Sequence, residues 1–478
     1  MFGTIKRPSF RPAINIGCMF DIPTGKYEKG SRGEMVLNGG LGPLTGIASR
    51  PNNFKTAIAV FFLAMSRRAM PRSFSLTYDT EGTLYPVARF GSISTQFAEL
   101  ENIDWEHDEQ FTFTDLSRYS GDEFFNEFRA GVGAKASKEK DYLTTTPFVD
   151  KDGKPQLCLY PTSALIDSFS KFQVSEVDKM YEKNKIGDGG NNTDAMTNGK
   201  AKNQMFNQLP QVCAKTGTYA VLTAHVGDVI VMDKYAIDKR NLSHMKKDTV
   251  LKGVSGGFYS LPNNVFSIEK NSPMLNKDKM PLYPLDNATA IEGDTDLREL
   301  TIMNLRGKNG MTGLPFTVVV SQNEGVQVGL TYFHHCKEHG WGIGGNMMNY
   351  HLALLPDVNL SRTKVRAKLL SDPVLVRAAE IQSEMLQLVQ FQRWDDEYIC
   401  APEQLYADLK AMGYDWAVLL DTRNYWMCPD DEKAPGIKPF LSTFDLLRMR
   451  KSEYVPFWFT KEQRAALKPL DLVQAKAA

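Results

Sequence analysis

The sequence lacks the features that mark membrane, secreted and disulfide-linked proteins. No apolar run reaches the roughly 18 residues that a membrane-spanning helix needs. The basic N-terminus, MFGTIKRPSF, has no apolar core of the kind found in signal peptides. The six cysteines form no C-x-x-C pair, which favours reduced thiols. We therefore expect a cytoplasmic protein without a membrane partner.

An excess of charge of one sign is also missing. The chain has 56 Lys and Arg residues and 56 Asp and Glu residues, so its net charge is zero. A neutral chain is not attracted as a whole to nucleic acid or anionic lipid, although a local basic face can still bind either. Its 478 residues are enough for two or three domains.

Glycine is missing from the polar loop, 49–54, of a stretch that otherwise has the layout of a phosphate-binding loop, Met35 to Ala57. An apolar segment leads into a polar loop, Ser49 to Phe54, and Lys55-Thr56 then opens an apolar run suited to a buried helix. The pattern G-x-x-x-x-G-K-[ST] requires glycine at both ends of that loop, where this chain has serine and phenylalanine. The layout still provides a helix N-terminus and a lysine that can bind phosphates, and a threonine that can hold Mg²⁺.

Two later segments end in the acidic residues that such a site needs. An alternating strand, Ser73 to Tyr78, is followed by Asp-Thr-Glu, and a more apolar strand ends at Asp167. In open α/β sheets ligands bind at the carboxyl ends of the strands. There Glu81 can orient an attacking water, and Asp167 can hold Mg²⁺. Each acid by itself also fits an ordinary polar turn.

Composition predicts three segments along the chain. Residues 1–34 form an irregular lead-in, 35–345 an α/β core, and 346–478 a mainly helical C-terminal module. Four of the six tryptophans lie in the last segment. They fit a small hydrophobic core better than a surface for stacking nucleic-acid bases.

The order of these features resembles that of RecA and UvsX-type recombinases, and most closely the UvsX-type proteins of large tailed phages. After the Asp167 strand comes another strand that ends at His225, and then the glycine-rich run 253–260. In those phage proteins Phe directly precedes the loop lysine, as Phe54 does here. The resemblance covers about residues 17–343. It implies an α/β fold with a RecA-like P-loop ATPase core and a mostly parallel sheet.

The resemblance also implies roles for individual residues, with ATP and Mg²⁺ as cofactors. Glu81, Lys55 and His225 would be catalytic, with His225 sensing the γ-phosphate. Thr56 and Asp167 would hold Mg²⁺. Arg306 and Lys308 would reach the ATP of a neighbouring subunit. The whole nucleotide-binding set is Ser49, Arg50, Pro51, Asn52, Asn53, Phe54, Lys55, Thr56, Asp167, Arg306 and Lys308.

Two loops, about 178–203 and 228–256, would face single-stranded DNA. The DNA-binding residues implied in the second loop are Lys234, Lys239, Arg240, Lys246 and Lys247. Four aspartates in the same segment leave a solvated surface as the alternative. His225 by itself also fits a core histidine. The i, i+4 pair His335 and His339 suggests a metal site, for which no further cluster of ligands is evident.

Together these features favour an ATP-dependent DNA recombinase that binds single-stranded DNA and promotes homologous strand exchange in phage recombination and repair. It would be a DNA-dependent ATPase that forms ADP and phosphate. We expect a homo-oligomer, filament or ring, with ATP at the subunit interfaces, acting in the host cytoplasm if phage-encoded. The alternatives are a ring-forming RecA-fold motor or helicase-like ATPase, and a catalytically inactive RecA-fold structural protein.

Overall fold

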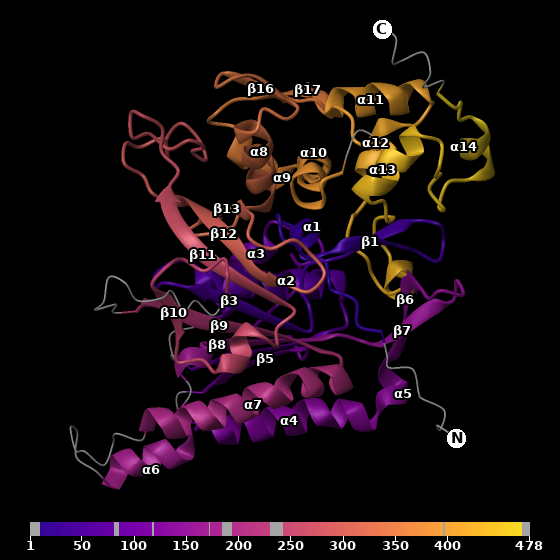
Figure 1. Cartoon of the computed structure of the whole chain (residues 1–478). Helices are drawn as coiled ribbons and strands as arrows, with labels where there is room; N and C mark the ends of the chain where they lie inside the picture. Colours follow the sequence, from indigo (N-terminus) through magenta and orange to yellow (C-terminus); the bar gives the residue numbers. More distant parts are fainter. Residues whose placement is uncertain are drawn as a thin grey trace.

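A computed structural model describes residues 10–80, 86–116, 119–171, 173–183, 194–229, 242–394 and 397–470. Its centre is one large sheet with the strand order β14-β13-β12-β11-β3-β9-β8-β4-β5, and β10 pairs with β9 (Figure 1). Helices cover both faces of this sheet, and the C-terminal region is mainly helical (Figure 1). The predicted α/β class with a mostly parallel sheet is confirmed.

Six neighbouring strands of the sheet run parallel, and the remaining strands pair antiparallel. The parallel strands are β3 (Leu44–Ser49), β4 (Phe74–Asp79), β5 (Phe111–Asp115), β8 (Thr162–Asp167), β9 (Thr218–Asp228) and β11 (Asn264–Pro273). The antiparallel strands are β10 (Thr249–Lys252), β12 (Leu297–Gly307), β13 (Pro315–Ser321) and β14 (Gly325–Val326). As a result, the carboxyl ends of β3, β4, β8 and β9 meet at one edge of the sheet.

Alternation along the central strands divides the interior into two cores. Ile47, Leu165 and Val221 belong to the core on the α2 side, and their strand neighbours Ala48 and Leu222 belong to the core on the α4 and α7 side. Every residue of β3 and β8 is buried, as expected for parallel strands covered on both faces. Helices lie along one face of the sheet (Figure 1). They are α4 (Gly121–Ser137), α6 (Ser175–Lys183) and α7 (Asp194–Thr216).

The opposite face is covered by α2 (Lys55–Ala69), whose apolar run is buried on all sides. Further elements continue this layer and extend it into the C-terminal region (Figure 1). The helices among them are α1 (Asp21–Thr24), α3 (Pro86–Ser94), α8 (Val328–Glu338), α9 (Val365–Ser371), α10 (Pro373–Gln392), α11 (Pro402–Ala411), α12 (Trp416–Leu420), α13 (Thr443–Arg450) and α14 (Lys461–Ala465).

Smaller elements complete the fold. A three-stranded sheet, which the sequence did not predict, interrupts the helical C-terminal region; it consists of β15 (Ile343–Asn346), β16 (Asn349–Leu352) and β17 (Leu355–Leu360). Two hairpins and a short helix lie nearer the N-terminus: β1 (Lys26–Lys29) with β2 (Met35–Asn38), β6 (Leu143–Val149) with β7 (Pro155–Leu159), and α5 (Glu139–Tyr142).

The hydrophobic core on the α2 side joins residues that are distant in the chain. It contains Phe20 from the lead-in, Phe61 from α2 and Leu375 from α10. Trp416 and Trp426 are buried, as predicted for a core role, but they lie in this large core and not in a small core of the tail. The division at residues 34 and 345 stays a prediction. No helix within the described ranges is long and apolar enough to cross a membrane. All six cysteines are free thiols.

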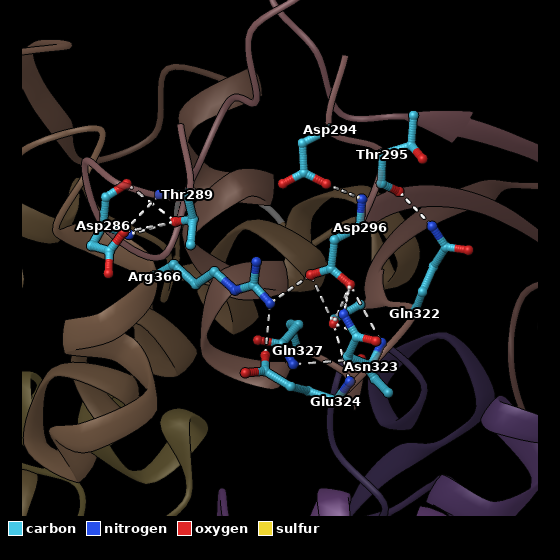
Figure 2. Close-up of polar contacts among 12 residues, drawn as sticks. Asp286, Thr289, Asp294, Thr295, Asp296, Gln322, Asn323, Glu324, Gln327 and Arg366 are labelled. Carbon is cyan, nitrogen blue, oxygen red and sulfur yellow. Dashed lines mark hydrogen bonds and ion pairs between the residues drawn. The ribbon is translucent and has the colours of Figure 1, made fainter. Parts of the chain in front are cut away.

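Arg366 of α9 connects the C-terminal region to the end of the sheet (Figure 2). Its guanidinium donates to Asp296 and to Glu324, both at 2.8 Å. Asp296 also accepts hydrogen bonds from the Ser321 hydroxyl and the Asn323 side chain. Because Arg366 is buried and paired to two carboxylates, its removal would leave them without their shared counter-charge.

A group of buried carboxylates lies where α1 meets α10 and α13. Asp21, Glu384 and Asp445 are at most 5 % exposed. Burial raises the pKa of Asp21 to about 7 and the pKa of Asp445 to about 7. Burial, and then the charge of Glu380, raise the pKa of Glu384 to about 8. These acids therefore bind protons more tightly in the folded protein than in the unfolded chain.

The free energy of unfolding should therefore fall as the pH rises from 6 to 8.5. A carboxyl with a raised folded pKa contributes its full stability below the unfolded pKa, near 4, and loses it as the pH rises through the folded value. For pKa values of 7 to 8 this amounts to roughly 1–2 kcal/mol per carboxyl. Urea unfolding at both pH values measures the effect. Glu384→Gln should weaken the pH dependence, whereas the exposed Glu403→Gln should not, and equal stability of the parent at both pH values would contradict this.

Candidate functional site

The loop predicted to bind phosphates connects the end of β3 to the start of α2. Arg50 to Phe54 form it, and both Asn52 (φ 61°) and Phe54 (φ 57°) adopt the left-handed backbone conformation. Phe54 occupies the N-cap position of α2, where the sequence pattern has glycine. Its ring packs against the core, which offsets the cost of this backbone conformation. The first N–H groups of α2 point toward the loop, and a phenylalanine side chain cannot cap them. They are therefore potential phosphate donors.

Four predicted site residues come together beside this loop: Lys55, Thr56, Asp167 and His225. The Lys55 ammonium lies 3.2 Å from Nε2 of His225 and 3.8 Å from Oδ1 of Asp167. The Thr56 hydroxyl donates to Oδ2 of Asp167 at 2.5 Å. Lys55 and Asp167 are both buried. They meet because β3, β8 and β9 are parallel, so the start of α2 lies beside the ends of β8 and β9.

Aspartates end three neighbouring strands in register. Asp115 of β5 lies beside Asp79 of β4, and Asp79 lies beside Asp167 of β8. The Thr80 N–H donates to the Asp167 carbonyl at 2.8 Å, and its hydroxyl accepts from the N–H of Ser168 at 2.9 Å. The ends of β4 and β8 are thus tied together. Glu81, the predicted catalytic acid, lies outside the described residues.

Arg50 connects the loop to the end of β9. Its guanidinium forms two hydrogen bonds with the carboxylate of Asp228, one of them 2.9 Å long. Both side chains are more than half exposed, so this pair contributes little to stability. It does place Arg50 next to the start of the second loop predicted to face DNA.

Arg306 and Lys308 lie at the opposite end of β3. Arg306 is in register with Val265, and its Nε donates to the Pro262 carbonyl at 3.0 Å. Asn264, which precedes Val265 on β11, is in register with Thr45 at the start of β3. The phosphate loop begins about a strand length away, roughly 15–20 Å for six residues. The structure therefore does not bring this pair to the loop of its own chain.

The predicted DNA-binding residues are only partly described. Lys234, Lys239 and Arg240 lie outside the described residues. Lys246 and Lys247 are exposed. The Lys246 ammonium donates to the Glu269 carbonyl at 3.0 Å and lies 3.2 Å from its carboxylate, so this cation already has a protein partner.

The histidine pair at the C-terminal end of α8, His335 in the helix and His339 just after it, has a structural explanation. His335 is buried, and its ring nitrogens contact the Ser383 hydroxyl at 2.8 Å and the Gln390 side chain at 2.9 Å. Burial lowers the pKa of His335 to about 4, which keeps the ring neutral. Among the described residues, no group of three or more His, Cys, Asp and Glu side chains could hold a metal ion.

Two hydroxyl residues join the site without having been predicted. The Thr223 hydroxyl donates to Oδ1 of Asp167. The Ser170 hydroxyl accepts from the N–H of His225 at 3.0 Å and donates to the carbonyl of Lys252 at 2.8 Å. A signal for Thr223 was present in the sequence, because residues two apart on a strand point to the same face and Thr223 precedes His225 by two.

Comparison with known proteins adds little. No family model and no curated protein matches the sequence. Among solved structures, the chain is similar to one titled "ATPase Domain of G40P", with a TM-score of 0.32 and 12% sequence identity. The match covers 59% of this chain and 82% of that chain.

Proposed function

We propose that the protein is an ATP-dependent DNA recombinase, which binds single-stranded DNA and couples strand exchange to ATP hydrolysis. The supporting observation is the convergence of Lys55, Thr56, Asp167 and His225 beside the N-terminus of α2. A helix N-terminus, a lysine, and a hydroxyl paired with a carboxylate are together the groups that a nucleoside triphosphate with Mg²⁺ requires.

Each residue then has a defined task. The N–H groups of α2 and the Lys55 ammonium bind the phosphate oxygens and balance their charge. The oxygens of Thr56 and Asp167 fit Mg²⁺, which prefers oxygen ligands and, when bound, neutralises charge on the phosphates. Glu81 orients the attacking water, and His225 contacts both Lys55 and, through its N–H, the Ser170 hydroxyl.

The proposed oligomer assigns Arg306 and Lys308 to the nucleotide of a neighbouring subunit. Because they lie at the far end of β3 from their own phosphate loop, they would act on a nucleotide bound to a neighbouring copy. A cation supplied by another subunit stabilises charge in the transition state, typically by about 10³–10⁵ in rate. ATP would therefore bind at subunit interfaces of a homo-oligomer.

The ATPase rate with and without single-stranded DNA tests the proposal. We expect hydrolysis that DNA stimulates. Neutralising Lys234, Lys239, Arg240, Lys246 and Lys247 together should remove the stimulation and keep the basal rate. If two or three of these cations contact phosphates, the slope of log affinity against log salt should flatten by roughly 1.4–2.1 units.

The other outcomes identify the alternative functions. Absence of hydrolysis at saturating ATP would contradict the proposal and favour a structural RecA-fold protein. Hydrolysis with an unchanged salt slope in the five-fold variant would exclude the 228–256 loop as the DNA contact. Rings in place of filaments on DNA, seen by negative stain, would favour the motor or helicase-like ATPase.

A further inference from the structure

Lys202 of α7 is a buried lysine that binds main-chain oxygens. Only 3 % of the residue is exposed. Its ammonium donates to the carbonyl of Ser170 at 3.0 Å and to the carbonyl of Gly253 at 2.8 Å. Burial lowers its pKa to about 8. Burying an ammonium costs free energy that an apolar side chain at this position would not incur, so its contacts call for an explanation beyond packing.

The two carbonyl groups belong to segments with different tasks. Ser170 follows Asp167 by three residues, in the 3-10 helix Phe169–Lys171. Gly253 follows β10 and begins the glycine-rich run that closes the second predicted DNA loop. Lys202 itself lies in the segment 178–203, predicted as the first DNA loop; the structure instead places residues 178–183 in the helix α6 and 194–203 in the helix α7. One ammonium therefore joins both predicted DNA loops to the strand that carries Asp167.

Ser170 and Gly253 are in close contact, and their geometry leaves little room for change. Gly253 has a φ of 66°, and a Cβ atom there would lie 2.5 Å from the Ser170 carbonyl oxygen. The Ser170 hydroxyl connects the same point to the N–H of His225 and to the carbonyl of Lys252. A shift of the segment after Asp167 therefore has to move the start of the glycine-rich run with it.

We propose that Lys202 is a positioning residue that couples the nucleotide site to the two loops at 178–203 and 228–256. The proposal rests on the proposed function, because it assigns those loops to DNA. Lys202 contacts neither nucleotide nor DNA. It holds the Ser170 segment, the Gly253 segment and α7 in one arrangement, so that a change at Asp167 and His225 is transmitted to both loops.

Lys202→Met should uncouple DNA from ATP hydrolysis. Methionine keeps most of the apolar stem and removes the ammonium. We expect the ratio of the DNA-stimulated to the basal kcat to fall toward 1, so that the stimulation seen in the parent is lost. The KM for ATP should change much less than this ratio. Lys202→Arg, which retains the donors, should restore part of the stimulation. Lys215→Met, at an exposed position of the same helix outside both predicted DNA loops, is the matched control.

Gly253→Ala provides a second route if Lys202→Met does not fold. The added methyl group would push the glycine run away from Ser170 without altering the lysine, and should likewise reduce the stimulation ratio. Full stimulation in folded Lys202→Met, or in Gly253→Ala, would overturn the inference. A parent protein that hydrolyses no ATP, or that DNA does not stimulate, would instead refute the proposed function, so the two failures can be distinguished.

Discussion

Lys55→Ala is expected to abolish ATP hydrolysis and to leave the protein folded. The Lys55 ammonium lies 3.2 Å from His225 and 3.8 Å from Asp167, at the point where the triphosphate would lie. Removing one preorganised charge-stabilising donor from an active site costs about 10²–10³ in kcat. Alanine also favours the helix that begins at this residue, and Asp167 retains its hydrogen bonds from Thr56 and Thr223.

Steady-state hydrolysis and thermal unfolding measure the two parts of this prediction. Lys151→Ala is the matched control, since Lys151 is exposed in the turn between β6 and β7. It should hydrolyse ATP at the parent rate. If Lys55→Ala unfolds at the parent temperature and still hydrolyses ATP at the parent rate, the nucleotide does not bind at this loop.

The convergence of the site could be predicted because it follows from strand direction. Thr56 and Asp167 are 111 positions apart, yet both follow from where parallel strands end and the next helix begins. The acids that end β4 and β8 and the histidine on β9 likewise lie at the carboxyl edge of the sheet. Sequence order and the carboxyl-edge rule therefore bring Lys55 and Asp167 together, whereas the place of His225 in the site was implied by the resemblance to UvsX-type proteins.

The pattern at Phe54 failed because it specifies a residue type, whereas the loop requires a backbone conformation. Glycine reaches a positive φ at little cost, but Phe54 reaches it as well, with its ring packed on the core. Likewise, the sequence did not predict β15, whose four residues include two glycines. In both places the tertiary contacts decide the conformation.

Lys202 shows a different limit of prediction from sequence. Its partners are main-chain carbonyls of residues 32 and 51 positions away, and any residue type has such a carbonyl. No pairing of side chains therefore marks the contact. The lead-in is a similar case: Ile14 and Phe20 are fully buried, but their segment is irregular and shows no periodicity from which burial could be inferred.

Asp167→Asn should reduce hydrolysis strongly and raise the Mg²⁺ concentration that the enzyme needs. The carboxylate accepts hydrogen bonds from Thr56 and Thr223, so the shape-conserving amide keeps the site packed but loses the negative charge. A metal contributes several kcal/mol to stabilising charge in such transition states, which corresponds to about 10²–10³ in rate. Hydrolysis measured against Mg²⁺ concentration tests this, with the exposed Asp141→Asn as control.

The Mg²⁺ titration also distinguishes Asp167 from its neighbour. Asp79 is buried and ends β4 in register with Asp167, so it is the other carboxylate that could hold the ion. If Asp167→Asn keeps the parent Mg²⁺ dependence and Asp79→Asn loses it, the metal role belongs to Asp79, and Asp167 serves to orient Thr56 and Lys55. If both variants keep it, neither carboxylate binds the ion and the assignment of Mg²⁺ to this edge of the sheet is wrong. A shift only in Asp167→Asn would support the pair Thr56 and Asp167, because the hydroxyl and the carboxylate are already 2.5 Å apart.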